Sequence, residues 1–89
     1  ILVIDDSESV RKSLKAVFSP YYRVSVAENG AAGLKEIAKE KPDMVLLDLV
    51  MPTLDGFKVL AMLRQQAETK DLPVFVITEQ QKTQDEQAL

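Results

Sequence analysis

Three short apolar runs, each ending directly on oxygen-bearing side chains, constrain this chain more than any other feature. The runs are residues 1–4 before Asp5 and Asp6, residues 44–47 before Asp48, and residues 74–77 before Thr78. Runs of this length, rich in β-branched residues, are typical of strands buried on both faces in a parallel sheet. Functional groups in such sheets gather beyond the carboxyl ends of the strands. If the runs lie parallel and adjacent, three carboxylates and one hydroxyl meet at one edge of the sheet.

Between these runs the apolar residues take helical spacing, so strands and helices alternate as in βαβ units. We expect a first helix that Ser7 caps and that ends at residues 19–20. A second helix follows a turn at residues 29–30 and stops before Pro42, and a third spans residues 56–66. The apolar residues expected to face the core from these helices are Val10, Leu14, Val17, Phe18, Leu34, Ile37, Ala38, Phe57, Leu60 and Leu63.

Two further segments bear on the order of the strands. Residues 22–27 form a strand in which apolar Val24 and Val26 alternate with polar residues, which indicates an edge strand with one wet face. Residues 74–77 lack the charges and alternation that protect an edge, so we expect an interior strand. Only a helix near Thr83 is expected after it. We therefore expect one α/β domain over residues 1–89, incomplete at its carboxyl end, with an exposed fourth-strand edge that favours dimerisation.

Composition excludes several kinds of function. The 89 residues suffice for one small domain and include no cysteine and no histidine, which excludes disulfides, thiolate chemistry and imidazole ligands. The net charge is −3 without a lysine or arginine cluster, which argues against nucleic-acid binding through this segment. No apolar stretch is long enough for a membrane span and no signal peptide is visible, so we expect no membrane association and a cytoplasmic setting.

The acidic residues gain their meaning from their combination. An acidic pair such as Asp5 and Asp6, taken alone, is more often a solvated turn that favours the start of the next helix. Together with Asp48, however, the pair would form a set of like charges that repel one another. A fold keeps such a set where something neutralises it, and Mg²⁺ is the natural cation for an all-oxygen site.

The order of the motifs resembles the receiver domain of two-component response regulators, the CheY-like family, along the whole chain. The matching motifs are the acidic pair, Asp48, Met51 with Pro52, Asp55 with Gly56, and Thr78. The resemblance implies a flavodoxin-like, doubly wound parallel sheet with helices on both faces. Its strand order would be 2-1-3-4, with the family's fifth strand beyond this chain.

The resemblance also implies residue roles and partners. Asp48 would be the phosphoacceptor, Thr78 the switch hydroxyl, and Asp6 the favoured direct ligand of Mg²⁺. Asp5, Asp48 and the main-chain carbonyl of Val50 would complete the metal site. A histidine kinase or phosphotransfer protein would supply the phosphoryl group and an effector would respond. The domain would then be a signalling module and not an enzyme, apart from its own phosphorylation and dephosphorylation.

Other readings remain open at this stage. Glu79 stands where the family usually has a small residue and would crowd an incoming phosphodonor, which favours a pseudo-receiver that only binds partners. The family's lysine and aromatic switch residue would lie beyond Leu89. A haloacid-dehalogenase-type phosphotransferase also uses an aspartate nucleophile, but it has a second acid two residues later, where this chain has Val50. A P-loop protein is excluded because no Gly-x-x-x-x-Gly-Lys is present.

Overall fold

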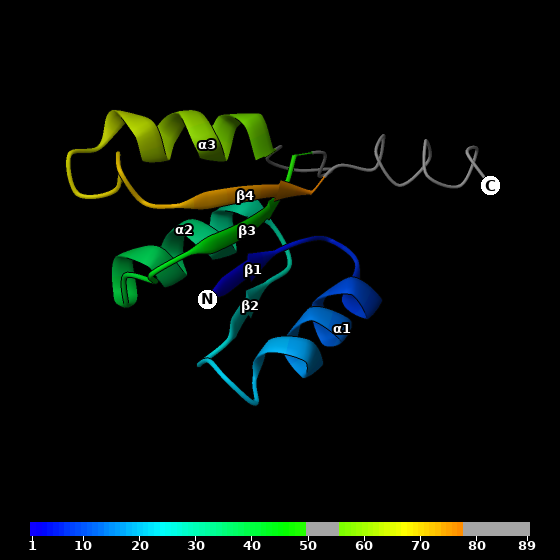
Figure 1. The fold of residues 1–89 in the computed structure, drawn as a ribbon. Helices are drawn as coiled ribbons and strands as arrows, with labels where there is room; N and C mark the ends of the chain where they lie inside the picture. Colours follow the sequence, from blue (N-terminus) through cyan, green and yellow to red (C-terminus); the bar gives the residue numbers. More distant parts are fainter. Residues whose placement is uncertain (50–55, 78–89) are drawn as a thin grey trace.

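The computed structural model describes residues 1–49 and 56–77 of the chain. Strands and helices alternate along it (Figure 1). The elements are β1 (Leu2–Ile4), α1 (Glu8–Phe18), β2 (Ser25–Ala27), α2 (Gly30–Lys39), β3 (Val45–Asp48), α3 (Gly56–Gln65) and β4 (Val74–Ile77). The four strands are all parallel, in the order β2-β1-β3-β4. This is the flavodoxin-like arrangement, so the predicted fold class and strand order are confirmed.

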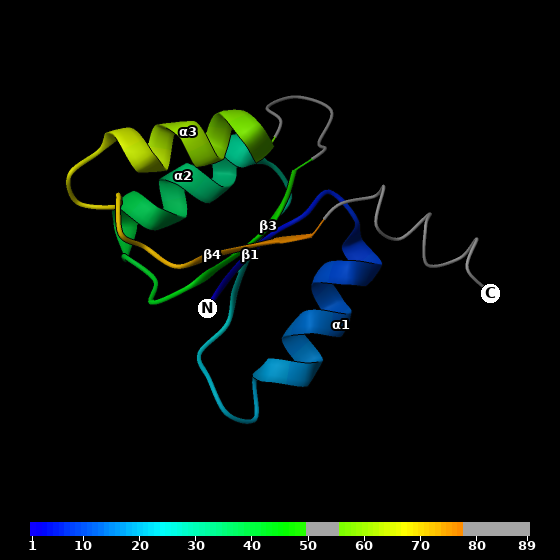
Figure 2. The same cartoon turned by 45° about the horizontal axis from the view of Figure 1, so that its top comes forward.

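Helices cover both faces of the sheet: α2 and α3 lie on one face and α1 on the other (Figures 1 and 2). Side chains alternate between the faces along each strand. The main hydrophobic core therefore forms between the sheet and the α2–α3 layer. Its strand residues are Leu2, Ile4, Ala27, Val45 and Leu47, and its helix and loop residues are Ile37, Val59, Leu63 and Leu72.

The edge position predicted for the second strand is confirmed, but β2 is shorter than residues 22–27. It spans only Ser25–Ala27 because its ladder runs opposite the three residues of β1. Tyr22 belongs instead to the turn after α1, since its backbone N–H donates to the carbonyl oxygen of Phe18 at 2.9 Å. The length of the partner strand, and not the local apolar pattern, sets where this strand begins.

Three apolar residues expected in the core point to solvent. Phe57 and Val17 are 63% and 60% exposed, and Ala38 is exposed as well. In α3 both Val59 and Leu63 are buried in the core; the predicted stripe of Phe57, Leu60 and Leu63 included Leu63 but left out Val59. Successive residues of a helix are rotated by about 100° about its axis. A small error in the predicted orientation of the buried face therefore places an apolar residue on the wrong side.

Strand β4 lacks the second neighbouring strand expected for an interior strand within the described part of the chain. Among the described residues it pairs with β3 alone, and Phe75 remains 58% exposed. Phe75 lies opposite Leu46 in the register, on the face of the sheet that α1 covers over β1 and β2. The helix expected near Thr83 falls outside the described residues. Within residues 1–49 and 56–77, no helix is both long and apolar enough to cross a membrane.

Candidate functional site

The two central strands deliver their terminal acidic residues to the same place. β1 and β3 run parallel with Ile4 opposite Leu47, so Asp5 and Asp48 occupy neighbouring positions at the carboxyl ends of these strands. Both side chains are 1% exposed, whereas Asp6 is exposed to solvent. One carboxylate oxygen from each of the three lies within 4.8 Å of the others. The structure therefore brings together the three acidic residues that the sequence predicted to meet, here called the acidic cluster.

Local contacts fix Asp5 from three sides. Its backbone N–H donates to the carbonyl oxygen of Ala27 in β2 at 3.1 Å. Its Oδ1 accepts a hydrogen bond from the backbone N–H of Ser7 at 2.9 Å, and its carbonyl oxygen accepts one from Nη1 of Arg11 at 2.8 Å. The carboxylate of Asp5 is thus held by the sheet and by the start of α1 together.

Asp6 owes its exposure to the cap of α1. Ser7 is the N-cap, and its Oγ accepts a hydrogen bond from the backbone N–H of Val10 at 3.3 Å. Asp6 is left between the end of β1 and this cap, facing solvent beside the two buried carboxylates. The helix also begins at this point, and the amino end of a helix carries a partial positive charge that favours nearby anions.

Gly56 positions α3 against the backbone of Asp48. A Cβ at Gly56 would overlap the carbonyl oxygen of Asp48 and the Cα of Leu49, and the Gly56 N–H donates to the Leu49 carbonyl oxygen at 2.7 Å. Only glycine permits so close an approach of two backbones. Gly56 by itself looks like a turn residue in the sequence, whereas the structure gives it this packing role.

Several predicted site residues lie outside the described residues: Val50, Thr78 and Glu79, together with the segment from Met51 to Asp55. Their predicted roles remain predictions. One residue at the site was not predicted at all, namely Arg11. A signal was available in the sequence, because the side chain of a basic residue one helical turn after a cap can reach back and donate a hydrogen bond to the loop that precedes the helix.

The arrangement has definite chemical possibilities. Like charges in a buried site repel strongly, because the low local dielectric screens them little. Carboxylate oxygens are the ligands that hard divalent cations such as Mg²⁺ prefer, and exposed Asp6 leaves one side of the cluster open to water and to a substrate. A carboxylate can also act as a covalent nucleophile. The donor set therefore fits a divalent cation next to a phosphate group.

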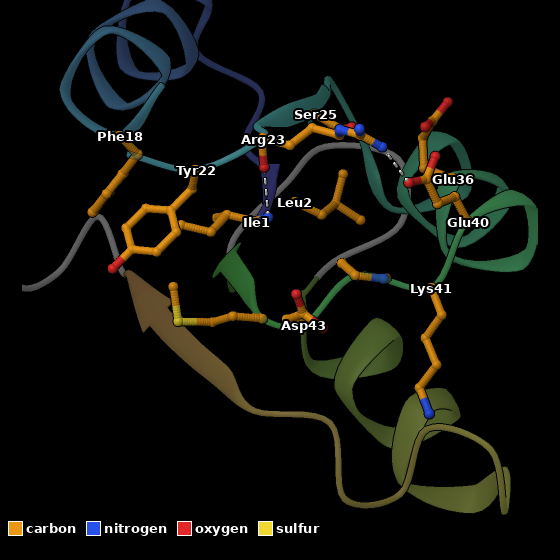
Figure 3. A pocket seen from close by; sticks show the side chains of 12 residues that line it. Ile1, Leu2, Phe18, Tyr22, Arg23, Ser25, Glu36, Glu40, Lys41 and Asp43 are labelled. Atoms are coloured by element: carbon orange, nitrogen blue, oxygen red, sulfur yellow. Dashed lines mark hydrogen bonds and ion pairs between the residues drawn. The ribbon is translucent and has the colours of Figure 1, made fainter. Parts of the chain in front are cut away.

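At the amino ends of the strands, the sheet carries opposite charges instead of like charges. A pocket of about 480 Å³ lies there, at the amino ends of β1 and β3, with the rings of Phe18 and Tyr22 on one side (Figure 3). Its Arg23 and Glu40 form an ion pair at 3.1 Å whose side chains are mostly exposed. An exposed pair of opposite charges is ordinary protein surface, so the acidic cluster is the better candidate for the functional site.

Comparison with known proteins shows the family to which the chain belongs. The family model of the response regulator receiver domain matches residues 1–89, which is the entire chain. Protein PilH of Pseudomonas aeruginosa is 42% identical over 79 residues, which cover 88% of this chain and 65% of PilH. Response regulator MprA of Mycolicibacterium vanbaalenii is 44% identical over 79 residues, which cover 88% of this chain and 33% of MprA.

A solved structure gives the same result for the fold. The chemotaxis protein CheY4 of Vibrio cholerae superposes with a TM-score of 0.79 at 28% identity, over 98% of this chain and 76% of that chain.

The chain spans only part of its curated relatives: its match covers about two-thirds of the length of PilH and one-third of that of MprA. Since the family model covers every residue, this chain belongs to the response regulator receiver domain family.

Proposed function

We propose that this chain is the phosphoacceptor domain of a two-component or phosphorelay system and that Asp48 takes the phosphoryl group. Its membership of the receiver family supports the proposal. The observation that carries it is the position of Asp48, a buried carboxylate at the end of a central strand with two further acids close by. Burying like charges together costs stability, so such a cluster is better explained by a ligand than by a structural role.

In the proposed reaction a carboxylate oxygen of Asp48 attacks the phosphorus of a phosphohistidine on the partner. The new O–P bond gives an acyl phosphate, while the P–N bond breaks and its electron pair leaves with the imidazole, which takes up a proton. This transfer needs an accurately placed nucleophile more than it needs further protein chemistry. Strand pairing on both sides of β3 and the backbone contact with Gly56 hold Asp48 in place.

We further propose that Asp5, Asp6, Asp48 and the main-chain carbonyl of Val50 hold Mg²⁺. The fit of the acidic cluster to an oxygen-ligated cation supports this assignment. When bound, Mg²⁺ neutralises the charge that would otherwise keep an anionic phosphoryl group away from an anionic carboxylate. Asp6 would face the open side of the site, and buried Asp5 would supply fixed negative charge from below.

Thr78 follows β4 directly in the sequence, and β4 pairs with β3 so that Ile77 lies opposite Asp48. We propose that the Thr78 hydroxyl donates a hydrogen bond to a phosphoryl oxygen after transfer. A change of the surrounding surface that follows this bond would carry the signal to an effector, because a local charge event can bias a loop between two arrangements.

The test is to incubate the chain with phosphoramidate and Mg²⁺ and to measure its intact mass, both for residues 1–89 and for a chain extended past Leu89. We expect the mass of one phosphoryl group to be added and Asp48→Asn to abolish the addition. Asp43→Asn, which removes an exposed carboxylate from the amino-end pocket, should leave uptake intact. An extended chain that stays unmodified would instead favour a pseudo-receiver.

A further inference from the structure

We infer that Arg11 is a positioning residue that holds the loop of Asp5, Asp6 and Ser7 in the geometry that binds the divalent cation. The inference rests on the proposed function for the cation itself. What the structure contributes is a contact: the guanidinium of Arg11, half-buried on α1, donates to the carbonyl oxygen of Asp5 at 2.8 Å.

Arg11 connects the two ends of this loop. Its side chain binds the carbonyl of Asp5 at the end of β1, and its own backbone N–H donates to the carbonyl oxygen of Ser7 at 3.0 Å. Asp6 lies between these two attachments, and its own side chain is exposed to solvent. The direction in which Asp6 points therefore depends on a backbone segment whose two ends Arg11 holds at a fixed separation.

The nature of the contact makes it strong enough for this role. A hydrogen bond from a charged donor is about twice as strong as one between neutral groups. Leaving a partly buried carbonyl without its donor would also carry a desolvation cost. Arginine suits the position better than lysine, because its guanidinium is planar, always charged and more weakly hydrated. Loss of the side chain should therefore loosen the loop and not only change the surface.

The charge of Arg11 gives the inference a sharp test, since charge and positioning predict opposite results. A cation beside the acidic cluster repels Mg²⁺, so removal of that charge alone should tighten Mg²⁺ binding. Removal of a positioning residue should weaken it, and loss of a partner that orients metal ligands typically costs about tenfold or more in affinity. The sign of the change in Kd thus separates the two roles.

The experiment compares Arg11→Ala and Arg11→Lys with Lys12→Ala in otherwise identical chains. Lys12→Ala is the matched control: it removes the same charge from the next residue of α1, and the contact that the structure gives Lys12 is an exposed pair with Glu8 at 3.2 Å. Titration calorimetry gives the Kd for Mg²⁺. Amide hydrogen exchange of the metal-free chains reports the Ser7 N–H, which donates to Asp5 Oδ1.

We expect Arg11→Ala to raise the Kd for Mg²⁺ about tenfold and to speed exchange of the Ser7 N–H. Arg11→Lys should show smaller increases in both the Kd and the exchange rate than Arg11→Ala does. Lys12→Ala should increase neither quantity. A Kd that is unchanged or lower in Arg11→Ala, with unchanged exchange at Ser7, would overturn the inference. If Arg11→Ala does not fold, the lysine variant decides by the same two readouts. If the unaltered chain binds no Mg²⁺, the proposed metal site fails, while exchange at Ser7 still decides whether Arg11 holds the loop.

Discussion

The two edges of the sheet treat charge in opposite ways. At the carboxyl edge, Asp5 and Asp48 are buried within reach of Asp6, three like charges in one place. At the amino edge, Arg23 and Glu40 pair as opposite charges in open solvent. Stability alone explains the second arrangement but not the first. The difference indicates that the carboxyl edge is maintained for a ligand, and the following variants probe that difference.

The largest effect on stability should come from adding a side-chain atom where α3 packs against the backbone of Asp48. Gly56→Ala should lower the free energy of unfolding by about 3 kcal/mol, because the new methyl group would overlap backbone atoms that cannot rotate away. Gly33→Ala is the matched control, since the atoms nearest to its methyl group would belong to the side chain of Ile4 and not to the backbone, and alanine favours a helix. Urea unfolding should show a clearly smaller loss there, and equal losses would mean that the contact of Gly56 with Asp48 is not special.

Mg²⁺ should stabilise the chain through the carboxyl edge alone. At one hundred times its Kd, a ligand of the native state adds about 2.7 kcal/mol to the free energy of unfolding. Asp6→Asn should remove most of this gain, whereas Asp43→Asn at the amino edge should keep it. Thermal unfolding with and without Mg²⁺ measures both. A melting temperature that ignores millimolar Mg²⁺ would contradict the metal site.

Without metal, the acidic cluster should destabilise the fold. We expect Asp48→Asn to raise the free energy of unfolding by about 1–3 kcal/mol in the presence of a chelator, because carboxylate oxygens of the three residues lie within 4.8 Å of one another and two unit charges at such a separation repel by about 3 kcal/mol at an effective dielectric constant of 20. Exposed Asp71 provides the control, and Asp71→Asn should change stability by much less. A destabilised Asp48→Asn would show that the buried carboxylate is compensated within the fold.

The smallest effect should come from the amino edge. Arg23→Ala removes an ion pair with Glu40 whose side chains are 85% and 69% exposed. Such pairs contribute about 0–1 kcal/mol, so urea unfolding should change within that range and the Kd for Mg²⁺ should stay the same. A large loss of stability, or weaker binding of Mg²⁺, would remove the contrast between the edges.

The sequence predicted the features that depend on where strands end. Alternating apolar runs and helical patterns were enough for a parallel α/β sheet with the second strand at its edge, whereas the full strand order came from the resemblance to the receiver family. Parallel, adjacent strands then place Asp5 and Asp48 at one end of the sheet. Features set by single packing contacts were not predictable from the apolar patterns. Gly56 packs against the backbone of Asp48 while the neighbouring Phe57 is exposed. The contact of Arg11 with the carbonyl of Asp5 leaves no periodic signal, and only the spacing of a basic residue one turn after the cap hints at it.

The most direct test of the central claim is to map the modified residue chemically. The chain is treated with phosphoramidate and Mg²⁺, then reduced with borohydride, which converts an aspartyl phosphate to homoserine, and its peptides are sequenced by mass spectrometry. We predict homoserine at position 48 only, and only when both the donor and Mg²⁺ were present. Homoserine at Asp5 or Asp6, or its absence from every peptide of an extended chain, would contradict the assignment of Asp48 as the phosphoacceptor.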